Sequence, residues 1–281
     1  MSINEVVIVT GASSGIGKAT VVELSKKNFH VIAGVLKEEE LKLFTETNVE
    51  PVLLDITNED DIASLVRLLN KNRKTYKIVS LINNAGIEFN APFELLKMED
   101  WRNQFDVNLF GQVALTKALL PFLRKSHGSI VNITSVGGKV AMPNYSAYAA
   151  TKFAFEAASD SLRRELKDQK IKVVIVEPGG IQTEMAAYSG DLSLNFEKTL
   201  SVEDKKLYSN LIKSAVASQS NFLKHAMTAE KAGKKVAAIA TKKKPRTRYS
   251  LGMDAKMTLP MVRFFPTKFV DWILELNRKL T

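Results

Sequence analysis

The chain has 281 residues, of which 45% are hydrophobic and 25% are charged, and it carries a formal net charge of +10 and no cysteine. This length and composition are those of a globular protein with a large core, which excludes disordered and fibrous classes. The lack of cysteine excludes disulfides, thiolate metal sites and thiol catalysis; because it agrees with a reducing compartment, we expect a cytoplasmic protein.

The N-terminus reads MSINEVVIVTGASSG, without a basic segment followed by a long apolar core, and no run of about 18 apolar residues occurs in the chain. We therefore expect neither a secretory signal nor a membrane span. We also predict no metal site.

The first two thirds of the chain alternate between strand and helix patterns. Short apolar runs without polar breaks, such as EVVIVT, are typical of strands buried on both faces. We predict strands at 5–10, 30–36, 49–57, 78–86, 128–135 and 172–179. Segments with helical periodicity predict helices at 18–27, 38–47, 59–72 (capped by Thr57 or Asn58), 98–126 and 148–167. This alternation predicts an α/β fold in one domain, 1–281: a doubly wound parallel sheet (Rossmann fold) with helices on both faces.

Residues 182–228 interrupt this alternation. The segment is too long for a plain connection and reads as helical pieces inserted after the strand at 172–179. In folds of this class, loops beyond the carboxyl ends of the strands line the ligand crevice. We therefore predict that residues 182–228 form a helical substrate cap.

The positive charge is concentrated in the C-terminal part of the chain. Residues 201–281 contain 17 Lys and Arg against 6 Asp and Glu, and the densest stretch is KKKPRTR at 242–248. Such a stretch is either a patch for nucleic acid or anionic membranes, or a solvated loop without a partner. We favour the loop, because the stretch lacks the interleaved aromatic residues of single-strand binders. We expect no nucleic-acid partner and at most a weak contact with a membrane surface.

A glycine-rich turn, TGASSGIG, follows the first strand directly and opens the first helix. Gly11 permits a tight turn, while Gly15 and Gly17 let the backbone approach a pyrophosphate at the positive end of the helix. The turn therefore predicts a dinucleotide site that includes Gly11, Ser13, Ser14, Gly15, Ile16 and Gly17.

Four further motifs follow in order along the chain. They are LDIT with Asp55, NNAG at 83–86, ITSVGG with Ser135 followed by Tyr148 and Lys152 in a Y-x-x-x-K pattern, and EPGGIQT at 177–183. Together with the glycine-rich turn, these motifs resemble the short-chain dehydrogenase/reductase family from residue 5 to about residue 185. The second-strand region and the C-terminal tail resemble its retinol and steroid dehydrogenase branch. The resemblance implies an oxidoreductase that acts on CH–OH groups with NAD(P).

The resemblance also extends the cofactor site. In the family, the acid of LDIT contacts the adenine amine, the NNAG backbone lines the ribose, and the Pro-Gly turn with its threonine closes over the nicotinamide. It therefore adds Asp55, Asn83, Ala85, Gly86, Tyr148, Lys152, Pro178, Gly179, Ile181 and Thr183 to this site.

The resemblance implies catalytic roles for Asn108, Ser135, Tyr148 and Lys152. Hydride transfer to a ketone requires a proton for the forming alkoxide, and the reverse reaction requires a base. A phenol with a pKa of about 10 is a weak base at neutral pH, so we expect Lys152, one helical turn from Tyr148, together with the positive nicotinamide of the oxidised cofactor, to lower the pKa of the phenol. Lys152 would also hold the nicotinamide ribose. We expect Ser135 to donate a hydrogen bond to the substrate oxygen, and Asn108 to hold a water that links Lys152 to solvent.

The end of the second strand normally selects between NAD and NADP, because an acid there binds the 2′-hydroxyl of NAD. That position is Val35, and the usual arginine position of NADP users is Leu36, so neither residue is diagnostic. The missing acid removes an obstacle to the 2′-phosphate, and Lys18 and Lys37 are near enough in sequence to pair with it. We therefore favour NADP(H) over NAD(H), with Lys37 in the cofactor site.

Apolar residues flank the reactive region and indicate a lipophilic ketone or secondary alcohol, such as a steroid, a retinoid or a fatty carbonyl compound. The apolar C-terminal segment either contributes to this site or packs in the core. The predicted substrate site consists of Ser135, Met142, Tyr145, Tyr148, Met185 and Tyr188.

Two other functions stay open: a non-catalytic dinucleotide-binding regulator or scaffold, and a basic nucleic-acid or membrane-surface binder. The regulator would be expected to lack Ser135, Tyr148 or Lys152, and all three are present. The helices at 98–126 and 148–167 resemble those through which family members associate, so we expect a homodimer or homotetramer.

Overall fold

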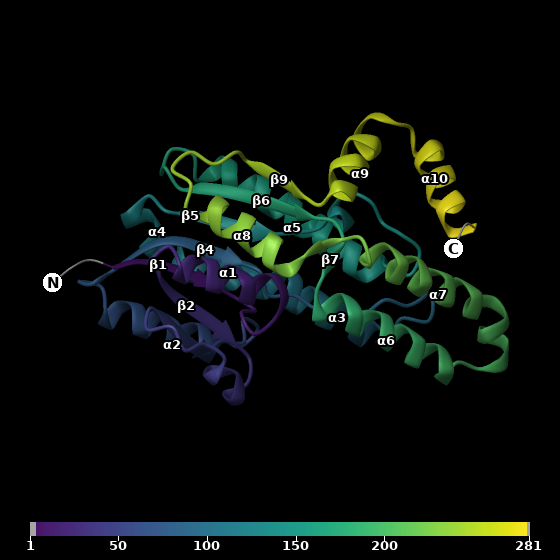
Figure 1. Ribbon diagram of the computed structural model, residues 1–281, viewed down its shortest axis with the longest axis horizontal. Coiled ribbons are helices and arrows are strands. Elements are labelled where there is room, and N and C mark those ends of the chain that lie inside the picture. Colours follow the sequence, from purple (N-terminus) through teal and green to yellow (C-terminus); the bar gives the residue numbers. More distant parts are fainter. Residues whose placement is uncertain (1–3, 280–281) are drawn as a thin grey trace.

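The computed structural model describes residues 4–279. Within them, the central feature is a parallel sheet of seven strands in the order β3-β2-β1-β4-β5-β6-β9 (Figure 1). The strands are β1 (Asn4–Val9), β2 (His30–Val35), β3 (Val49–Leu53), β4 (Tyr76–Asn83), β5 (Ser129–Ile133), β6 (Lys172–Pro178) and β9 (Arg248–Leu251). The strand order reverses between β1 and β4, and such a reversal opens a crevice at the carboxyl ends of the strands. The predicted Rossmann fold is confirmed.

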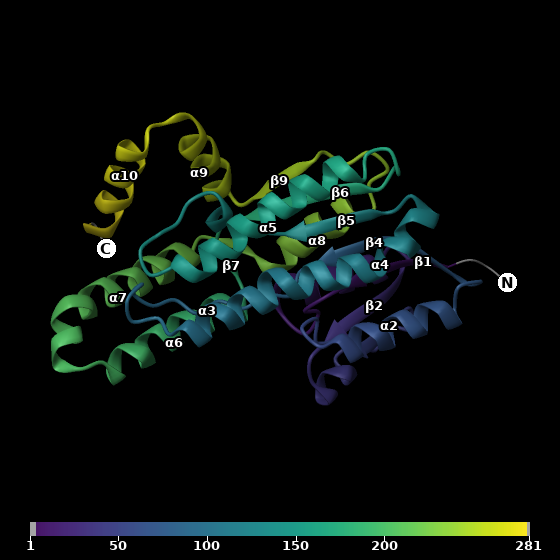
Figure 2. The same ribbon diagram turned by 180° about the vertical axis from the view of Figure 1, so that it is seen from behind.

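Helices cover both faces of the sheet, as the two views show (Figures 1 and 2). One face carries α1 (Gly15–Ser25) and α8 (Ala229–Ala240); the other carries α2 (Glu59–Lys71), α4 (Gln112–Ser126) and α5 (Ser146–Glu165). Along β1, Val7 and Val9 pack into the core of the first face and Val6 and Ile8 into that of the second, and all four are fully buried. The side-chain period of two therefore explains why the strand needs an unbroken apolar run.

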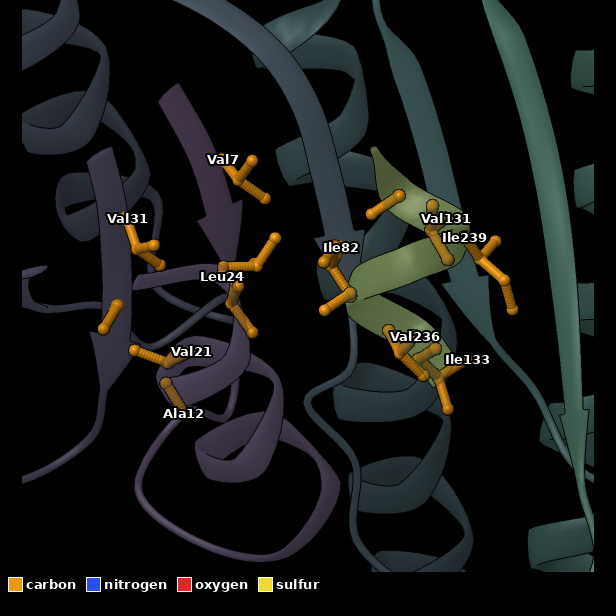
Figure 3. Packing of buried hydrophobic residues seen from close by; sticks show 14 of the residues in the cluster. Val7, Ala12, Val21, Leu24, Val31, Ile82, Val131, Ile133, Val236 and Ile239 are labelled. Carbon is orange, nitrogen blue, oxygen red and sulfur yellow. The ribbon is translucent and has the colours of Figure 1, made fainter. Parts of the chain in front are cut away.

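The core under α1 and α8 is seen from close by in Figure 3, where Ile239 and Val236 of α8 lie beside Val131 and Ile133 of β5. The two helices approach closely because Gly233 of α8 faces α1. A Cβ on Gly233 would overlap Ala19 and the backbone that follows it. This close contact buries the apolar faces of both helices.

Two predicted elements end earlier than expected. The helix at 38–47 is only a 3-10 turn, η1 (Glu38–Lys42), which begins with three consecutive glutamates and buries none of its residues. A segment without a buried face gains little tertiary stabilisation, so it does not continue as an α-helix. The strand at 49–57 ends at Leu53, because Asp55 accepts hydrogen bonds from the backbone N–H and hydroxyl of Thr57 in a turn. Asn58, and not Thr57, caps α2.

The helix predicted at 98–126 contains an interruption. It consists of α3 (Met98–Phe105), a π-helical turn η2 (Asp106–Gly111) and α4. The π-helical turn surrounds Asn108, whose side chain bonds to a neighbouring loop instead of to its own helix. Periodicity could not reveal this turn, because its cause is a contact with a distant part of the chain.

Helices extend beyond the sheet at one end of the molecule (Figure 1). The predicted cap region contains the short strands β7 (Ile181–Gln182) and β8 (Met227–Thr228), which pair with each other, and the helices α6 (Glu184–Thr199) and α7 (Val202–Leu223). After β9 follow α9 (Met253–Phe264) and α10 (Thr267–Lys279), and α10 returns to contact α7. No helix within residues 4–279 is both long and apolar enough to cross a membrane.

The last residue of the basic stretch 242–248 has carboxylate partners. Arg248 forms ion pairs with Glu156, Glu177 (2.8 Å) and Asp160 (2.9 Å), and the side chains of the two glutamates are only 3% and 7% exposed. Buried carboxylates are costly unless they are paired. Arg248 therefore ties β9 to β6 and α5, whereas Arg246 is exposed.

We expect the Arg248→Ala variant to lose about 3 kcal/mol of unfolding free energy, because it leaves Glu156 and Glu177 buried without this partner. Urea denaturation measures the change. Arg246→Ala removes the same charge from the exposed part of the stretch and should change the stability by less than about 0.5 kcal/mol. Equal losses in both variants would contradict this account of the ion pairs.

Candidate active site

A cavity of about 1600 Å³ opens at the carboxyl ends of the strands, between the sheet and helices α6, α7, α9 and α10. It brings together most of the residues that the sequence motifs predict. The predicted residues that line it are Gly11, Ser13, Ser14, Gly15, Ile16, Asp55, Ala85, Gly86, Ser135, Met142, Tyr145, Tyr148, Lys152, Pro178, Gly179, Ile181, Thr183 and Met185.

The glycine-rich turn adopts a backbone that only glycine tolerates well. Gly11 and Gly15 have φ angles of +59° and +50°, in the left-handed region. A Cβ on Gly17 would overlap the carbonyl oxygen of Gly11 and lie 2.5 Å from Nδ2 of Asn84. That same Nδ2 donates to the carbonyl oxygens of Thr10 (2.9 Å) and Gly11 (3.0 Å), so the turn is fastened to the end of β4.

Ser135, Tyr148 and Lys152 meet on one wall of the cavity. Ser135 and Tyr148 meet beside Gly137, where a Cβ would lie 3.3 Å from Oγ of Ser135 and 3.3 Å from the Tyr148 ring, and Nζ of Lys152 lies 5.6 Å from the centre of that ring. Lys152 also donates to the backbone carbonyl of Ile133 at 3.3 Å. Tyr148 and Lys152 are 7% and 5% exposed, so both polar groups are largely withdrawn from water.

Asn108 stands behind this wall and does not line the cavity. Its Oδ1 accepts from the backbone N–H of Ile87 (2.8 Å), and its Nδ2 donates to the carbonyl of Ile87 (2.9 Å) and to the hydroxyl of Thr151 (3.1 Å). A Cβ on Gly86 would lie 3.2 Å from Oδ1 of Asn108 and 3.7 Å from Nζ of Lys152. The amide therefore stands near the ammonium while it joins the loop after β4 to α5.

Comparison with known proteins gives the family of this fold and site. Residues 5–192 match the family described as short chain dehydrogenase. The chain belongs to the short-chain dehydrogenase family. It is 38% identical to a 3-amino-tetrahydro-pyrrolizinone reductase of Xenorhabdus hominickii over 89% of this chain and 87% of that protein. It is 34% identical to retinol dehydrogenase 7 of Mus musculus (95% and 87%) and 34% identical to 17-beta-hydroxysteroid dehydrogenase type 6 of Rattus norvegicus (97% and 88%).

Solved structures agree with this assignment. A short-chain dehydrogenase from Streptomyces avermitilis aligns over 100% of both chains, with a TM-score of 0.74 and 26% identity. One from Burkholderia cenocepacia, in complex with NADP, aligns over 94% and 95% with a TM-score of 0.71 and 26% identity. The protein is therefore an NAD(P)-dependent oxidoreductase that acts on CH–OH groups, and its resemblance to the retinol and steroid dehydrogenase branch is confirmed.

The glycine-rich turn of this short-chain dehydrogenase fits the phosphates of a dinucleotide. The backbone N–H of Gly15, in the first turn of α1, donates to a carboxylate oxygen of Glu184 at 3.0 Å. A helix N-terminus favours anions, and here it already holds a negatively charged oxygen. Gly11 and Gly15 carry no side chain and leave room for a pyrophosphate on the same backbone.

The pKa of Tyr148 changes in the opposite direction to the one expected from sequence. Burial raises it above its usual value, the Glu88 carboxylate raises it further, and only the hydrogen bond with Ser135 opposes them. Burial lowers the pKa of Lys152 to about 8, against the opposing effect of Glu88 and Glu156. In the protein alone, the loss of water around a phenolate outweighs the favourable neighbours that the sequence identified.

Besides Asn108, four predicted residues lie away from the cavity lining. Gly17 packs under the turn, and Lys37 is an exposed residue whose backbone N–H bonds to Glu40. Tyr188, on α6, is 63% exposed. The notable correction concerns Asn83, which is fully buried in the sheet and donates to Thr116 (2.9 Å) and Asn132 (2.8 Å).

The family resemblance implies that the NNAG asparagines stabilise the sheet while the backbone lines the ribose, and the Asn83 side chain does connect β4 to β5 and α4 instead of facing the cofactor site. Its neighbour Asn84 lines the cavity instead. The alternation of side chains along a strand places neighbours on opposite sides, so the first asparagine of NNAG supports the sheet and the second faces the site.

Sequence reasoning missed several lining residues. Glu88 follows NNAG by two residues and carries a charge at the carboxyl edge of the sheet, which was a signal available in the sequence. The α7 and α10 residues gave no such signal, because only the return of these helices over the sheet brings them to the cavity. They are Leu211, Ala215, Ser218, Gln219, Asn221, Phe222, Leu223, Phe269, Asp271, Ile273, Leu274 and Glu275.

Proposed function

We propose that this enzyme interconverts lipophilic ketones and secondary alcohols with NADP(H), and that Tyr148 is its general acid and base. The observation that carries the proposal is the contact of Tyr148 with Ser135, beside Lys152, on the wall of a largely apolar cavity. The nicotinamide, when bound, supplies or accepts the hydride.

Four side chains position the substrate oxygen and transfer the proton. Ser135 donates a hydrogen bond that positions the substrate oxygen, and Tyr148 gives its proton to that oxygen as the alkoxide forms. The Lys152 ammonium stabilises the resulting phenolate. Because Asn108 and Lys152 both lie beside Gly86, a water held by Asn108 can return a proton from solvent to this wall.

The lining supports a lipophilic substrate. Carbon-rich side chains of the loop after η3 (Val136–Gly138), of α7 and of the C-terminal helices face the cavity. Two relatives are named for retinol and hydroxysteroid dehydrogenation, and a third is named a reductase of an amino-bearing pyrrolizinone. The apolar residues include Val140, Met142, Phe222, Met257, Met261, Phe265 and Phe269.

The cofactor preference rests on the end of β2. Val35 is buried, and Leu36 lines the cavity where an acid would bind the 2′-hydroxyl of NAD. Lys18 and Lys37, the cations that the sequence offered for a 2′-phosphate, are not among the lining residues. NADP in the Burkholderia relative supports the choice. A cytoplasmic location stays a prediction from the absence of cysteine.

We expect the wild-type enzyme to reduce hydrophobic ketones with NADPH at a higher kcat/KM than with NADH, and Tyr148→Phe to lower kcat by about 10²–10⁴-fold because it removes the proton donor. Nicotinamide absorbance with a panel of steroid, retinoid and alkyl carbonyl compounds measures both. Turnover of sugars or acyl thioesters alone would contradict the lipophilic substrate.

Cofactor titration by calorimetry is the control for this variant. Tyr148→Phe keeps the ring and should retain cofactor binding, which separates a chemical defect from misfolding. A non-catalytic dinucleotide binder would bind the cofactor and turn over nothing in the wild-type form.

The two pKa shifts predict how the rates depend on pH. Tyr148, with its raised pKa, stays a proton donor at neutral pH and becomes a base only at alkaline pH. Lys152 loses its charge as the pH rises through about 8. Initial rates of ketone reduction should therefore be level near pH 7 and fall above about pH 8, while alcohol oxidation should increase only at more alkaline pH, where Tyr148 ionises. An oxidation optimum at or below neutral pH would argue against these assignments.

We also propose a homodimer or homotetramer formed through η2, α4 and α5. Phe110, Val113 and Phe153 are 58%, 36% and 43% exposed on these neighbouring elements. Light scattering should give a multiple of the chain mass, and a Phe110→Glu, Phe153→Glu double variant should dissociate. A wild-type monomer would refute the association.

A further inference from the structure

Glu88 is a carboxylate on the catalytic cavity for which the proposed reaction has no role. It lies in the loop that follows β4 and lines the cavity together with Tyr145, Tyr148 and Lys152. Its Oε1 accepts hydrogen bonds from Nδ2 of Asn90 at 2.6 Å and from the hydroxyl of Ser189 at 3.2 Å. These two donors fix the position of the side chain between the loop and α6.

The second oxygen of Glu88 has no such partner. Within residues 4–279, Oε2 accepts no hydrogen bond, and no nitrogen of a basic side chain forms an ion pair with the carboxylate. Lys152 attracts Glu88 only from a longer distance, and its ammonium donates instead to the carbonyl of Ile133. Glu88 is partly exposed and lines the cavity, so Oε2 is an acceptor that a ligand in the cavity can reach.

The charges of the residues that line the cavity also favour a ligand with a positive charge. Although the chain has a net charge of +10, the charged side chains among the described lining residues are one lysine and five carboxylates. Of these carboxylates, Asp254 already accepts the backbone N–H of Gly180 at 2.8 Å. A cavity lined by one sign of charge attracts ligands of the other sign. The charged lining residues are Asp55, Glu88, Lys152, Asp254, Asp271 and Glu275.

We propose that Glu88 determines substrate specificity by accepting a hydrogen bond, through Oε2, from a protonated amine on the substrate. The substrate is then a ketone or alcohol with an apolar body and one cationic nitrogen. This inference rests on the proposed function, because the amine belongs to the molecule whose carbonyl or hydroxyl group reacts at Tyr148.

Two other roles for Glu88 make different predictions. If it only fastens α6 through Ser189, loss of the Ser189 hydroxyl should have the same effect as loss of the charge. If it only acts on the charges of Tyr148 and Lys152, its neutralisation should change the rates of all substrates by the same factor, with or without an amine. A recognition role changes only the ratio between substrates.

The test uses straight-chain methyl ketones of several lengths, each made with a terminal methyl, hydroxyl or primary amino group. We compare kcat/KM in the wild type, in Glu88→Gln, whose amide oxygen still accepts from Asn90 and Ser189, and in Ser189→Ala, which keeps the charge. At the best chain length, the amine-to-methyl ratio should fall about 10–100-fold in Glu88→Gln and stay unchanged in Ser189→Ala.

The remaining comparisons test whether the ligand must be cationic and whether Glu88 recognises it. A wild-type preference for the hydroxyl equal to that for the amine would overturn the cationic ligand, and an unchanged amine-to-methyl ratio in Glu88→Gln would overturn the role of Glu88. In both cases reduction of the methyl ketones would still support the proposed function. If no ketone is reduced with either cofactor, the proposed function fails. Calorimetric titration of the same amines into wild type and Glu88→Gln then tests recognition alone: tighter binding by the wild type supports it and equal binding refutes it.

Discussion

The arrangement of the active site depends on the hydrogen bonds that join the end of β1 to the end of β4. The hydroxyl of Thr10 accepts the backbone N–H groups of Asn84 (2.9 Å) and Ala85 (3.0 Å), while the Asn84 amide returns to the carbonyls of Thr10 and Gly11. These bonds bridge the point where the strand order reverses. They fix the glycine-rich turn relative to the loop after β4, which leads toward Ser135, Tyr148 and Lys152. The proposed cofactor and substrate sites are therefore held in a fixed arrangement relative to each other.

Local sequence predicted the sheet well, because strands buried on both faces must be apolar throughout and the pattern needs no knowledge of partners. The failures are elements whose fate is decided by distant contacts. The π-helical turn at Asn108 exists because its amide bonds to Ile87, and the predicted helix at 38–47 is short because its glutamates find no surface to pack against. Amphipathic periodicity contains neither fact.

Sequence likewise predicted some residues of the candidate site correctly and others incorrectly. Residues that stand in ordered motifs at strand ends, such as Gly11, Ser135 and Tyr148, reach the cavity because a parallel sheet collects its carboxyl ends on one edge. Asn83 was misplaced because two adjacent asparagines look alike in sequence but point to different sides. The direction of the Tyr148 pKa was also missed, since spacing gives the neighbours of a group but not the water it loses on folding.

The π-helical turn has a consequence for selectivity. The Asn108 amide bonds to both the N–H and the carbonyl of Ile87, the residue directly before Glu88. The π-helical turn therefore helps to fix the position of the Glu88 side chain in the cavity. Hydrogen bonds are short-ranged, and a displacement of the backbone by a fraction of an ångström alters which ligand atoms the acid can reach. Substitutions at Asn108, which does not itself line the cavity, would therefore change which substrates the enzyme accepts.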